Sequence, residues 1–359
     1  MSILDGLNTQ QRAAVTHSGT PLLVIAGAGS GKTRVLTRRI AYLLSERDVA
    51  PYEVLAITFT NKAANEMKER VIELVGNRAK SMWVSTFHSA CVRILRSDAV
   101  ALGYSNSFTI YDAADSLRLV TLVMKDMNLD PKRYNSRAIA GLISDAKNEL
   151  MGPADFAQTV KNQFDEIVAE VFTHYQKRLS SANALDFDDL ISRTVELLQR
   201  HPEIRAKYRS RFKHILVDEY QDTNHAQYIL IRELVGTSFD GFPMAELCVV
   251  GDSDQSIYAF RGANIRNILQ FEDDFPDATT VLLEQNYRST QNILSAANAV
   301  IANNEGRKAK NLWSESGSGD VIKGYVAEDE HDEADYVINE IRSEEHTSEL
   351  QSLRHLVCR

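Results

Sequence analysis

The sequence is poor in cysteine and has no long apolar run. Its 359 residues include three cysteines, Cys91, Cys248 and Cys358, at spacings that match no metal site. Such scattered cysteines are typical of free thiols in a reducing compartment, so we expect a cytoplasmic protein. No stretch is long and apolar enough to span a bilayer, and the first residues, MSILDGLNTQQ, lack the basic and apolar regions of a signal peptide. These absences argue against secreted and membrane classes.

Positive charge is also scarce. The sequence has 40 Lys and Arg against 49 Asp and Glu, a net charge of −9. This balance argues against a coat-like or histone-like nucleic-acid binder. It does not exclude a local groove, in which a few basic and aromatic side chains hold a strand. With 44% hydrophobic and 25% charged residues, the composition is that of a globular protein, and its length suggests two to three domains of about 150 residues.

Short β-branched runs that end in polar or glycine-rich loops alternate with helical patterns along much of the chain. One helical pattern is 61–74, where Ala64, Met67, Val71 and Leu74 fall on one face. Alternation of this kind predicts an α/β fold with a parallel sheet and helices on both faces. Ligands of such sheets bind at the carboxyl ends of the strands. The runs are 22–26, 54–58, 215–217, 247–250 and 281–283.

Between 113 and 207 the strand-like runs disappear and helical periodicity takes over. Because the strand pattern resumes at 215, we predict a helical domain, 113–207, inserted into an α/β domain made of 1–112 and 208–283. Further along, a Gly/Ser-rich turn at 314–320 precedes another candidate strand at 321–326. A helix is predicted at 333–342.

The segment AGAGSGKT follows a predicted strand and opens a predicted helix, which is the context of a phosphate-binding loop. Its glycines let the backbone N–H groups and the helix N-terminus face phosphates. Lys32 would contact the β- and γ-phosphates of ATP, and the Thr33 hydroxyl would bind Mg²⁺. Ala26 stands where the strict pattern has a glycine. The loop consists of Ala26, Gly27, Ala28, Gly29, Ser30, Gly31, Lys32 and Thr33.

A pair of acids follows the strand at 215–217, in the segment VDEYQD. Asp218 is predicted to act on Mg²⁺, as an acid at a strand end commonly does beside a phosphate loop. Glu219 would orient or deprotonate the attacking water. The alternative is a charge pair at a helix N-terminus with no catalytic role.

Taken in order, the motifs resemble those of the UvrD/PcrA/Rep-like DNA helicases of superfamily 1, from about residue 7 to 342. The resemblance implies a RecA-like sheet, with the beginning of a second RecA-like domain at 284–342. The matching segments are LNTQQ at 7–11, AGAGSGKT at 26–33, ITFTNKAANEM at 57–67, TFHS at 86–89, LDFDDL at 185–190, VDEYQD at 217–222, GDSDQSIYAFRGA at 251–263 and LEQNYRS at 283–289.

By matching positions, the resemblance implies further roles at the nucleotide. Gln11 would read the adenine edge, and Tyr287 would stack on the adenine ring. Gln255 would sense the γ-phosphate. Arg288 resembles an arginine finger, which in such enzymes raises turnover by about 10³–10⁵. Arg34, next to the loop, would also face the nucleotide.

The same resemblance implies a track for single-stranded DNA, with aromatic rings that stack on bases and polar groups that contact the backbone. Its residues are Phe59, Thr60, Asn61, Phe87, His88, Phe187, Tyr258, Phe260 and Arg261. For the aromatic residues the alternative is core packing, and for His88 it is a capping or core role. Phe260 departs from the tryptophan common in the family, which predicts weaker stacking.

The family resemblance implies an ATP-dependent, Mg²⁺-requiring helicase that moves 3′-to-5′ on single-stranded DNA and unwinds DNA at single-strand/duplex junctions. It also implies repair or replication proteins as partners. We expect a truncated form, since the family's second motor domain continues further. The segment RSEEHTSELQS at 342–352 matches a translated sequencing adapter, so 343–359 is expected to be a non-family tail, with a divergent genuine tail as the alternative. Two other interpretations stay open: a non-catalytic or poorly folded fragment that binds ATP and single-stranded DNA, and the motor portion of a helicase–nuclease.

Overall fold

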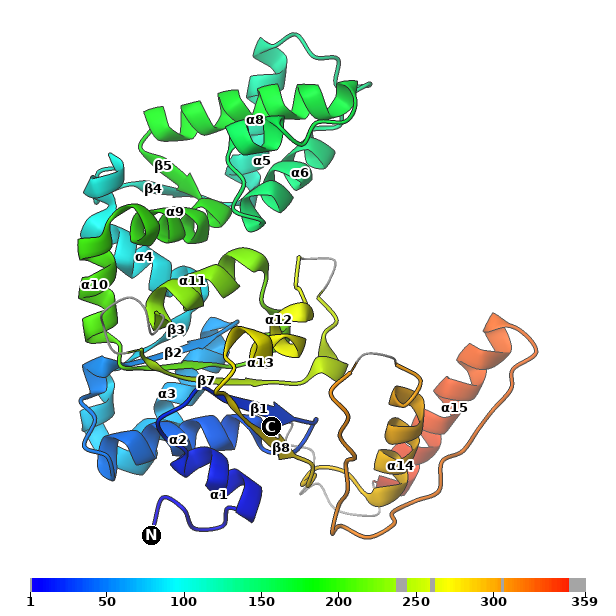
Figure 1. Cartoon of the computed structure of the whole chain (residues 1–359). Helices are drawn as coiled ribbons and strands as arrows, with labels where there is room; N and C mark the ends of the chain where they lie inside the picture. The colour runs from blue at the N-terminus through cyan, green and yellow to red at the C-terminus, as the bar shows by residue number, and fades with distance from the viewer. Residues whose placement is uncertain (1, 237–243, 259–261, 305–306, 349–359) are drawn as a thin grey trace.

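A central parallel sheet organises the chain, as the sequence predicts. The computed structural model describes residues 2–236, 244–258, 262–304 and 307–348. Within these residues six strands pair in parallel in the order β3-β2-β6-β7-β1-β8 (Figure 1). They are β1 (Leu22–Ala26), β2 (Val54–Thr58), β3 (Trp83–Thr86), β6 (His214–Val217), β7 (Glu246–Gly251) and β8 (Thr279–Leu283).

Helices cover both faces of this sheet, because successive strand residues point to opposite sides. In β1, Leu22 and Val24 pack on one face and Leu23 and Ile25 on the other. The first face carries α1 (Thr9–Thr16), α2 (Lys32–Ser45) and α3 (Asn61–Val75). The second carries α4 (Phe87–Asp98), α9 (Phe187–Arg200), α10 (Pro202–Arg211), α11 (His225–Val235), α12 (Arg266–Leu269) and α13 (Phe271–Asp274). The chain also has 3₁₀ turns η1 (Pro51–Glu53), η2 (Gly76–Ser81), η3 (Ala99–Leu102), η4 (Tyr220–Asp222) and η5 (Ser253–Gln255).

A mainly helical region leaves the sheet after β3 and returns before β6, and it lies at the top of Figure 1. It contains α5 (Ala113–Asp126), α6 (Ser136–Asn148), α7 (Pro153–Ala157) and α8 (Gln163–Ser181), followed by α9 and α10. Helices α5, α6 and α8 share a core of their own, whereas α9 and α10 pack into the core of the sheet. The sequence did not predict the short parallel pair β4 (Thr109–Tyr111) and β5 (Ala184–Asp186), since three residues are too few to show alternation.

The expected strand at 321–326 is wrong. The structure has no regular element there, and Val321 and Val326 are 78% and 94% exposed. A β-branched run becomes a strand when a neighbouring strand takes up its hydrogen bonds, and no described segment pairs with this one. The segment lies between α14 (Gln291–Ile301) and α15 (Glu330–Ser348). Helix α15 begins ahead of the predicted 333, where the Asp329 carboxylate accepts from the Asp332 N–H at 2.9 Å.

Among the described residues, no helix is long and apolar enough to cross a membrane.

The buried strands predict a contrast between two leucines. Leu23 in β1 is fully buried and Leu282 in β8 is 37% exposed. Leu23→Ala should lower the free energy of unfolding by about 2–5 kcal/mol, because it leaves a cavity between sheet and helices. Leu282→Ala should cost less than about 1 kcal/mol. Urea denaturation followed by circular dichroism compares them, and equal losses would contradict the assigned layers.

Candidate functional site

The motif loops lie at one edge of the sheet. All six strands run parallel, so the loop after each strand emerges at the same side. The phosphate loop follows β1, the acid pair follows β6, residues 252–255 follow β7 and residues 284–288 follow β8. The predicted DNA-binding segments at 59–61 and 87–88 follow β2 and β3. The edge therefore has a nucleotide half, at β6-β7-β1-β8, and a second half at β3-β2.

The phosphate loop has a backbone that requires glycine. Gly29 and Gly31 have φ of 71° and 90°, values that side chains disfavour. A Cβ on Gly27 would lie 2.3 Å from Leu312 Cδ2. Gly31 caps α2 without a side-chain hydrogen bond, so the first N–H groups of this 14-residue helix are left for a ligand. Ala26 is buried at the end of β1, so it would contact phosphate only through its backbone.

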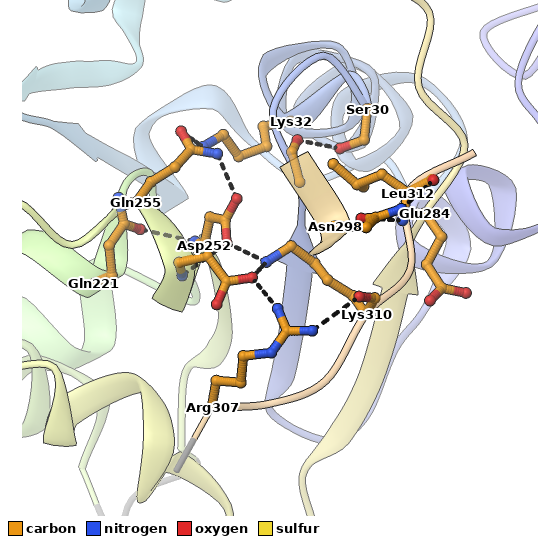
Figure 2. Close-up of polar contacts among 12 residues, drawn as sticks. Ser30, Lys32, Gln221, Asp252, Gln255, Glu284, Asn298, Arg307, Lys310 and Leu312 are labelled. Carbon is orange, nitrogen blue, oxygen red and sulfur yellow. Dashed lines mark hydrogen bonds and ion pairs between the residues drawn. The ribbon is translucent and has the colours of Figure 1, made fainter. Parts of the chain in front are cut away.

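Lys32 joins the predicted catalytic residues. Its Nζ donates to Glu219 Oε2 at 3.0 Å and to Gln255 Oε1 at 3.3 Å (Figure 2 shows Lys32 and Gln255). Glu219 has a left-handed backbone, with φ of 50° and ψ of 44°. Such a conformation costs on the order of 1–3 kcal/mol in a residue other than glycine, and it is common at active sites. The structure thus brings together three side chains that are far apart in sequence.

A closed ring of hydrogen bonds surrounds this contact. Gln255 Nε2 donates to Asp252 Oδ2, and the Asp252 N–H donates to Gln221 Oε1 at 2.9 Å. Gln221 Nε2 then donates to Glu219 Oε2 at 3.0 Å, which leads back to Lys32. The sequence motifs include Gln221 and Asp252, but motif matching assigned them no role.

Asp218 lies in a site that disfavours its charge. Burial, and then the negative charge of Glu219, raise the pKa of Asp218 to about 7, while Lys32 partly opposes the rise. A divalent cation would satisfy this carboxylate. The described residues contain no group of three or more His, Cys, Asp or Glu that could hold a metal unaided. Asp218 and Thr33 nevertheless fit Mg²⁺, which takes one or two protein ligands and completes its shell with phosphates and water.

Residues after β8 lie directly on the phosphate loop. Asn286 Nδ2 donates to the Ala28 carbonyl at 2.6 Å, and the Tyr287 N–H donates to the Gly29 carbonyl at 2.9 Å. A Cβ on Gly29 would lie 2.8 Å from the Arg288 Cβ. The Arg288 side chain is exposed and has no hydrogen-bond or ion-pair partner among the described residues. A guanidinium without a partner beside the loop is available to a phosphate.

The predicted adenine-binding residues gather at α1. Tyr287 is 47% exposed, and its hydroxyl accepts from Asn8 Nδ2 at 2.9 Å. Gln11 is fully buried, donates from Nε2 to the Ser30 carbonyl at 2.9 Å, and accepts at Oε1 from the Asn8 N–H. In this structure Gln11 ties α1 to the phosphate loop, so its contact with adenine stays a prediction. Arg34 is exposed, and its Nη2 lies 2.8 Å from where a Cβ on Gly6 would be.

The predicted DNA residues divide by exposure. Phe187 at the start of α9 is 47% exposed, and its ring meets His88 edge-on at 5.7 Å. Burial lowers the pKa of His88, which favours the neutral ring. Tyr258 is 39% exposed. These side chains are accessible to a strand.

The burial of Phe87 contradicts its predicted contact with DNA. It is 2% exposed and belongs to the core above the sheet, so the core-packing alternative holds for this ring. Phe59 is half-buried and meets Phe87 edge-on at 5.6 Å. Thr60 caps α3 by accepting from the Ala63 N–H at 3.1 Å, and Asn61 beside it is exposed. Phe260 and Arg261 lie outside the described residues.

Two basic residues were missed by the sequence analysis. Lys310 Nζ donates to Asp252 and Asp254, and Arg307 Nη1 donates to Asp254 Oδ2 at 2.7 Å (Figure 2). They stand in an ordinary polar run, RKAKN, and no local signal marks them. Asn286, by contrast, lies inside the motif LEQNYRS, so a closer reading of that motif could have found it.

Two cavities, of about 320 and 290 Å³, lie in the helical region and not at the phosphate loop. The second is lined by Phe187 and its neighbours Asp186 and Asp188.

Comparison with known proteins decides the family. A family model described as the UvrD/REP helicase N-terminal domain matches residues 7–276. The chain belongs to the UvrD/REP helicase family. A second model, the UvrD-like helicase C-terminal domain, matches residues 281–358. That match runs through the segment expected to be a non-family tail, and the nature of this tail stays a prediction.

Curated UvrD/REP relatives agree with this assignment. The chain is 62% identical over 344 residues to the ATP-dependent DNA helicase UvrD1 of Mycobacterium tuberculosis. This match covers 94% of the chain and 45% of the relative. It is 54% identical over 340 residues to the ATP-dependent DNA helicase PcrA of Staphylococcus aureus, with 95% and 46% covered. The chain therefore spans about half the length of the curated relatives it matches. These relatives are named as enzymes.

The charges around Asp218 predict opposite effects from two substitutions. Lys32→Met should raise the pKa of Asp218 above about 7, because it removes the opposing positive charge. Glu219→Gln should lower it, because a neighbouring negative charge is lost. Carboxyl titration by ¹³C NMR without nucleotide or metal measures both. Shifts of the same sign in the two variants would contradict the electrostatic account.

Proposed function

We propose that this chain binds Mg²⁺-ATP and single-stranded DNA and couples ATP hydrolysis to 3′-to-5′ movement along the strand, as part of a DNA helicase of the UvrD/PcrA type. The observation that carries the proposal is the common edge of the parallel sheet. Phosphate loop, acid pair, Gln255 and Arg288 meet at one end of this edge. Exposed Phe187 and half-buried His88 lie in contact with each other near its other end.

Residues 1–112 and 208–283 form the first motor domain in this proposal, and 113–207 form an insert. The segment 284–342 begins a second motor domain. The contacts of Asn286 and Tyr287 with the phosphate loop support a nucleotide site built from both. Repair or replication proteins as partners and a cytoplasmic location stay predictions.

Nucleotide binding would begin with a change of partners at Lys32. In the structure its ammonium is held by Glu219 and Gln255. The β- and γ-phosphates carry more negative charge than these groups and would draw Lys32 toward the loop. Glu219 would then be free to orient and deprotonate the attacking water, while Gln255 would meet the γ-phosphate. The same lysine thus keeps the base inactive until substrate arrives.

Charge at the phosphates would be neutralised from several sides. Thr33 and Asp218 would hold Mg²⁺, which would supply positive charge to offset that of the phosphates. Arg288 lies beside the loop and would reach the transferred phosphate as charge develops. Tyr287, held at α1 by Asn8, offers a half-exposed ring for the adenine.

Steady-state ATPase of this chain, with and without oligo(dT), tests the proposal. DNA-stimulated hydrolysis is expected. If the chain binds ATP but shows neither basal nor stimulated hydrolysis, enzyme activity is refuted. The result would then support the alternative, a non-catalytic nucleotide-binding fragment.

Lys32→Ala should abolish hydrolysis, because the phosphates lose their main positive charge. Its affinity for single-stranded DNA should stay within about threefold of wild type, since Lys32 lies in the nucleotide half of the edge. Fluorescence anisotropy with labelled oligo(dT), run beside the ATPase assay, compares the two. Equal losses of both would mean that the DNA track is misplaced.

Two phenylalanines separate DNA binding from core packing. Phe187→Ala should weaken binding of single-stranded DNA roughly 5- to 150-fold for every sequence, the equivalent of about 1–3 kcal/mol of stacking. Phe87→Ala should instead lower the free energy of unfolding by about 3–5 kcal/mol. Anisotropy and thermal melting measure both variants. A sequence-selective loss in Phe187→Ala would count against stacking.

A further inference from the structure

A short segment that follows α14 reaches into the nucleotide site. We call residues 307–313 the bridge segment. Lys310, in this segment, is 7% exposed, and its Nζ donates to Asp252 Oδ1 and Asp254 Oδ2. Arg307 donates to the same Asp254 oxygen at 2.7 Å (Figure 2). The bridge segment therefore supplies two positive charges to residues 252–255, the sensor loop.

Asp252 is the point where this contact meets the catalytic ring. One of its carboxylate oxygens accepts from Lys310 Nζ, and the other accepts from Gln255 Nε2. Gln255 Oε1 in turn accepts from Lys32 Nζ at 3.3 Å. A single carboxylate thus lies between Lys310 and the predicted γ-phosphate sensor. Any displacement of Lys310 changes the group that orients Gln255.

The sensor loop depends on Lys310 for its charge balance. Asp252 is 2% exposed, and a buried carboxylate that loses its cation must move, take up a proton or draw in water. Asp254 pairs with the same ammonium. Loss of Lys310 would therefore leave the carboxylates of Asp252 and Asp254 with Arg307 as their remaining cation. The conformation of residues 252–255 is therefore conditional on the position of the bridge segment.

Hydrogen bonds join the bridge segment to α14. Asn298 of α14 donates to the Leu312 carbonyl at 2.9 Å and accepts from the Leu312 N–H at 3.2 Å. The Asn311 N–H donates to Glu284 at 2.7 Å. Leu312 also lies against Gly27 of the phosphate loop. The bridge segment therefore connects α14 with both the phosphate loop and the sensor loop.

We propose that Lys310, assisted by Arg307, is a positioning residue that orients Gln255 through Asp252. The response to the γ-phosphate then depends on the position of α14 and of the bridge segment. This inference rests on the proposed ATP hydrolysis. The inference adds to that function a specific link between Lys310, which lies outside the nucleotide motifs, and Gln255, the predicted γ-phosphate sensor.

Lys310→Met tests the link, with Lys308→Met as the matched control in the same segment. Lys308 forms a surface pair with Glu272 at 2.8 Å and does not contact the sensor loop. Lys310→Met is expected to lower kcat of the DNA-stimulated ATPase at least tenfold and to change KM for ATP less than threefold. Lys310→Arg should recover kcat to within about threefold of wild type, because a guanidinium restores the charge. Lys308→Met should stay within twofold.

A loss of folding is distinguished by a second variant. Lys310→Met/Asp252→Asn removes both partners and leaves no buried carboxylate at position 252, so it should melt close to wild type. It is expected to keep the low kcat of Lys310→Met. Wild-type kcat in either variant, or a fall in kcat that matches the fall in folded fraction, would overturn the proposal.

A binding measurement separates this proposal from the proposed function. The ratio of the Kd for ADP to the Kd for a non-hydrolysable ATP analogue reports γ-phosphate sensing without turnover. If wild type hydrolyses no ATP, the proposed activity fails, but Lys310→Met should still bring this ratio toward one and leave the Kd for ADP within threefold. An unchanged ratio would overturn the link. A wild-type chain that does not distinguish the analogue from ADP would also overturn the link, whereas the ATPase assay alone decides the proposed hydrolysis.

Discussion

Parallel pairing of the strands is the constraint on which the nucleotide site depends. It makes every strand finish at the same edge, and the order β6-β7-β1-β8 then decides which loops are neighbours. The phosphate loop after β1 has the sensor loop on one side and residues 284–288 on the other. Lys32 can therefore reach Glu219 and Gln255 at once, although 187 and 223 positions separate it from them in sequence. An antiparallel neighbour would have placed its loop at the opposite edge.

Carboxylates from the loops after β6 and β7 lie close together in the nucleotide half of this edge. The cations Lys32, Lys310 and Arg307 face the carboxylates of Asp218, Glu219, Asp252 and Asp254. Burial and the charge of Glu219 also raise the pKa of Asp222 to about 6. Phosphates would add more negative charge, so a nucleotide without a divalent cation should bind poorly. The proposed Mg²⁺ requirement agrees with these carboxylates, whose charge is disfavoured where they lie, as well as with the family. The same cluster of carboxylates explains why cations from other segments, such as Lys310, lie in the site.

The meeting of the nucleotide motifs at one edge of the sheet could be predicted because these motifs are local. A glycine loop between strand and helix, or two acids after a strand, carries its chemistry within a few neighbouring residues. What failed depends on distant partners. Residues 321–326 have strand composition but no neighbouring strand among the described residues, and Phe87 sits in a DNA motif yet faces the core. The role of Lys310 is visible only when the fold brings it to Asp252, more than fifty residues away in sequence.

The same dependence on buried charge holds at the proposed DNA contact. Phe187 follows Asp186, and the Lys147 ammonium of α6 pairs with Asp186 and, at 3.0 Å, with Asp189. Burial alone would lower the pKa of Lys147, but the charges of Asp189 and Asp186 hold it above its usual value. The start of α9, and with it the exposed Phe187 ring, is therefore held by a cation from the helical insert. At both ends of the edge, a lysine from outside the sheet pairs with a buried aspartate, Lys310 with Asp252 and Lys147 with Asp186.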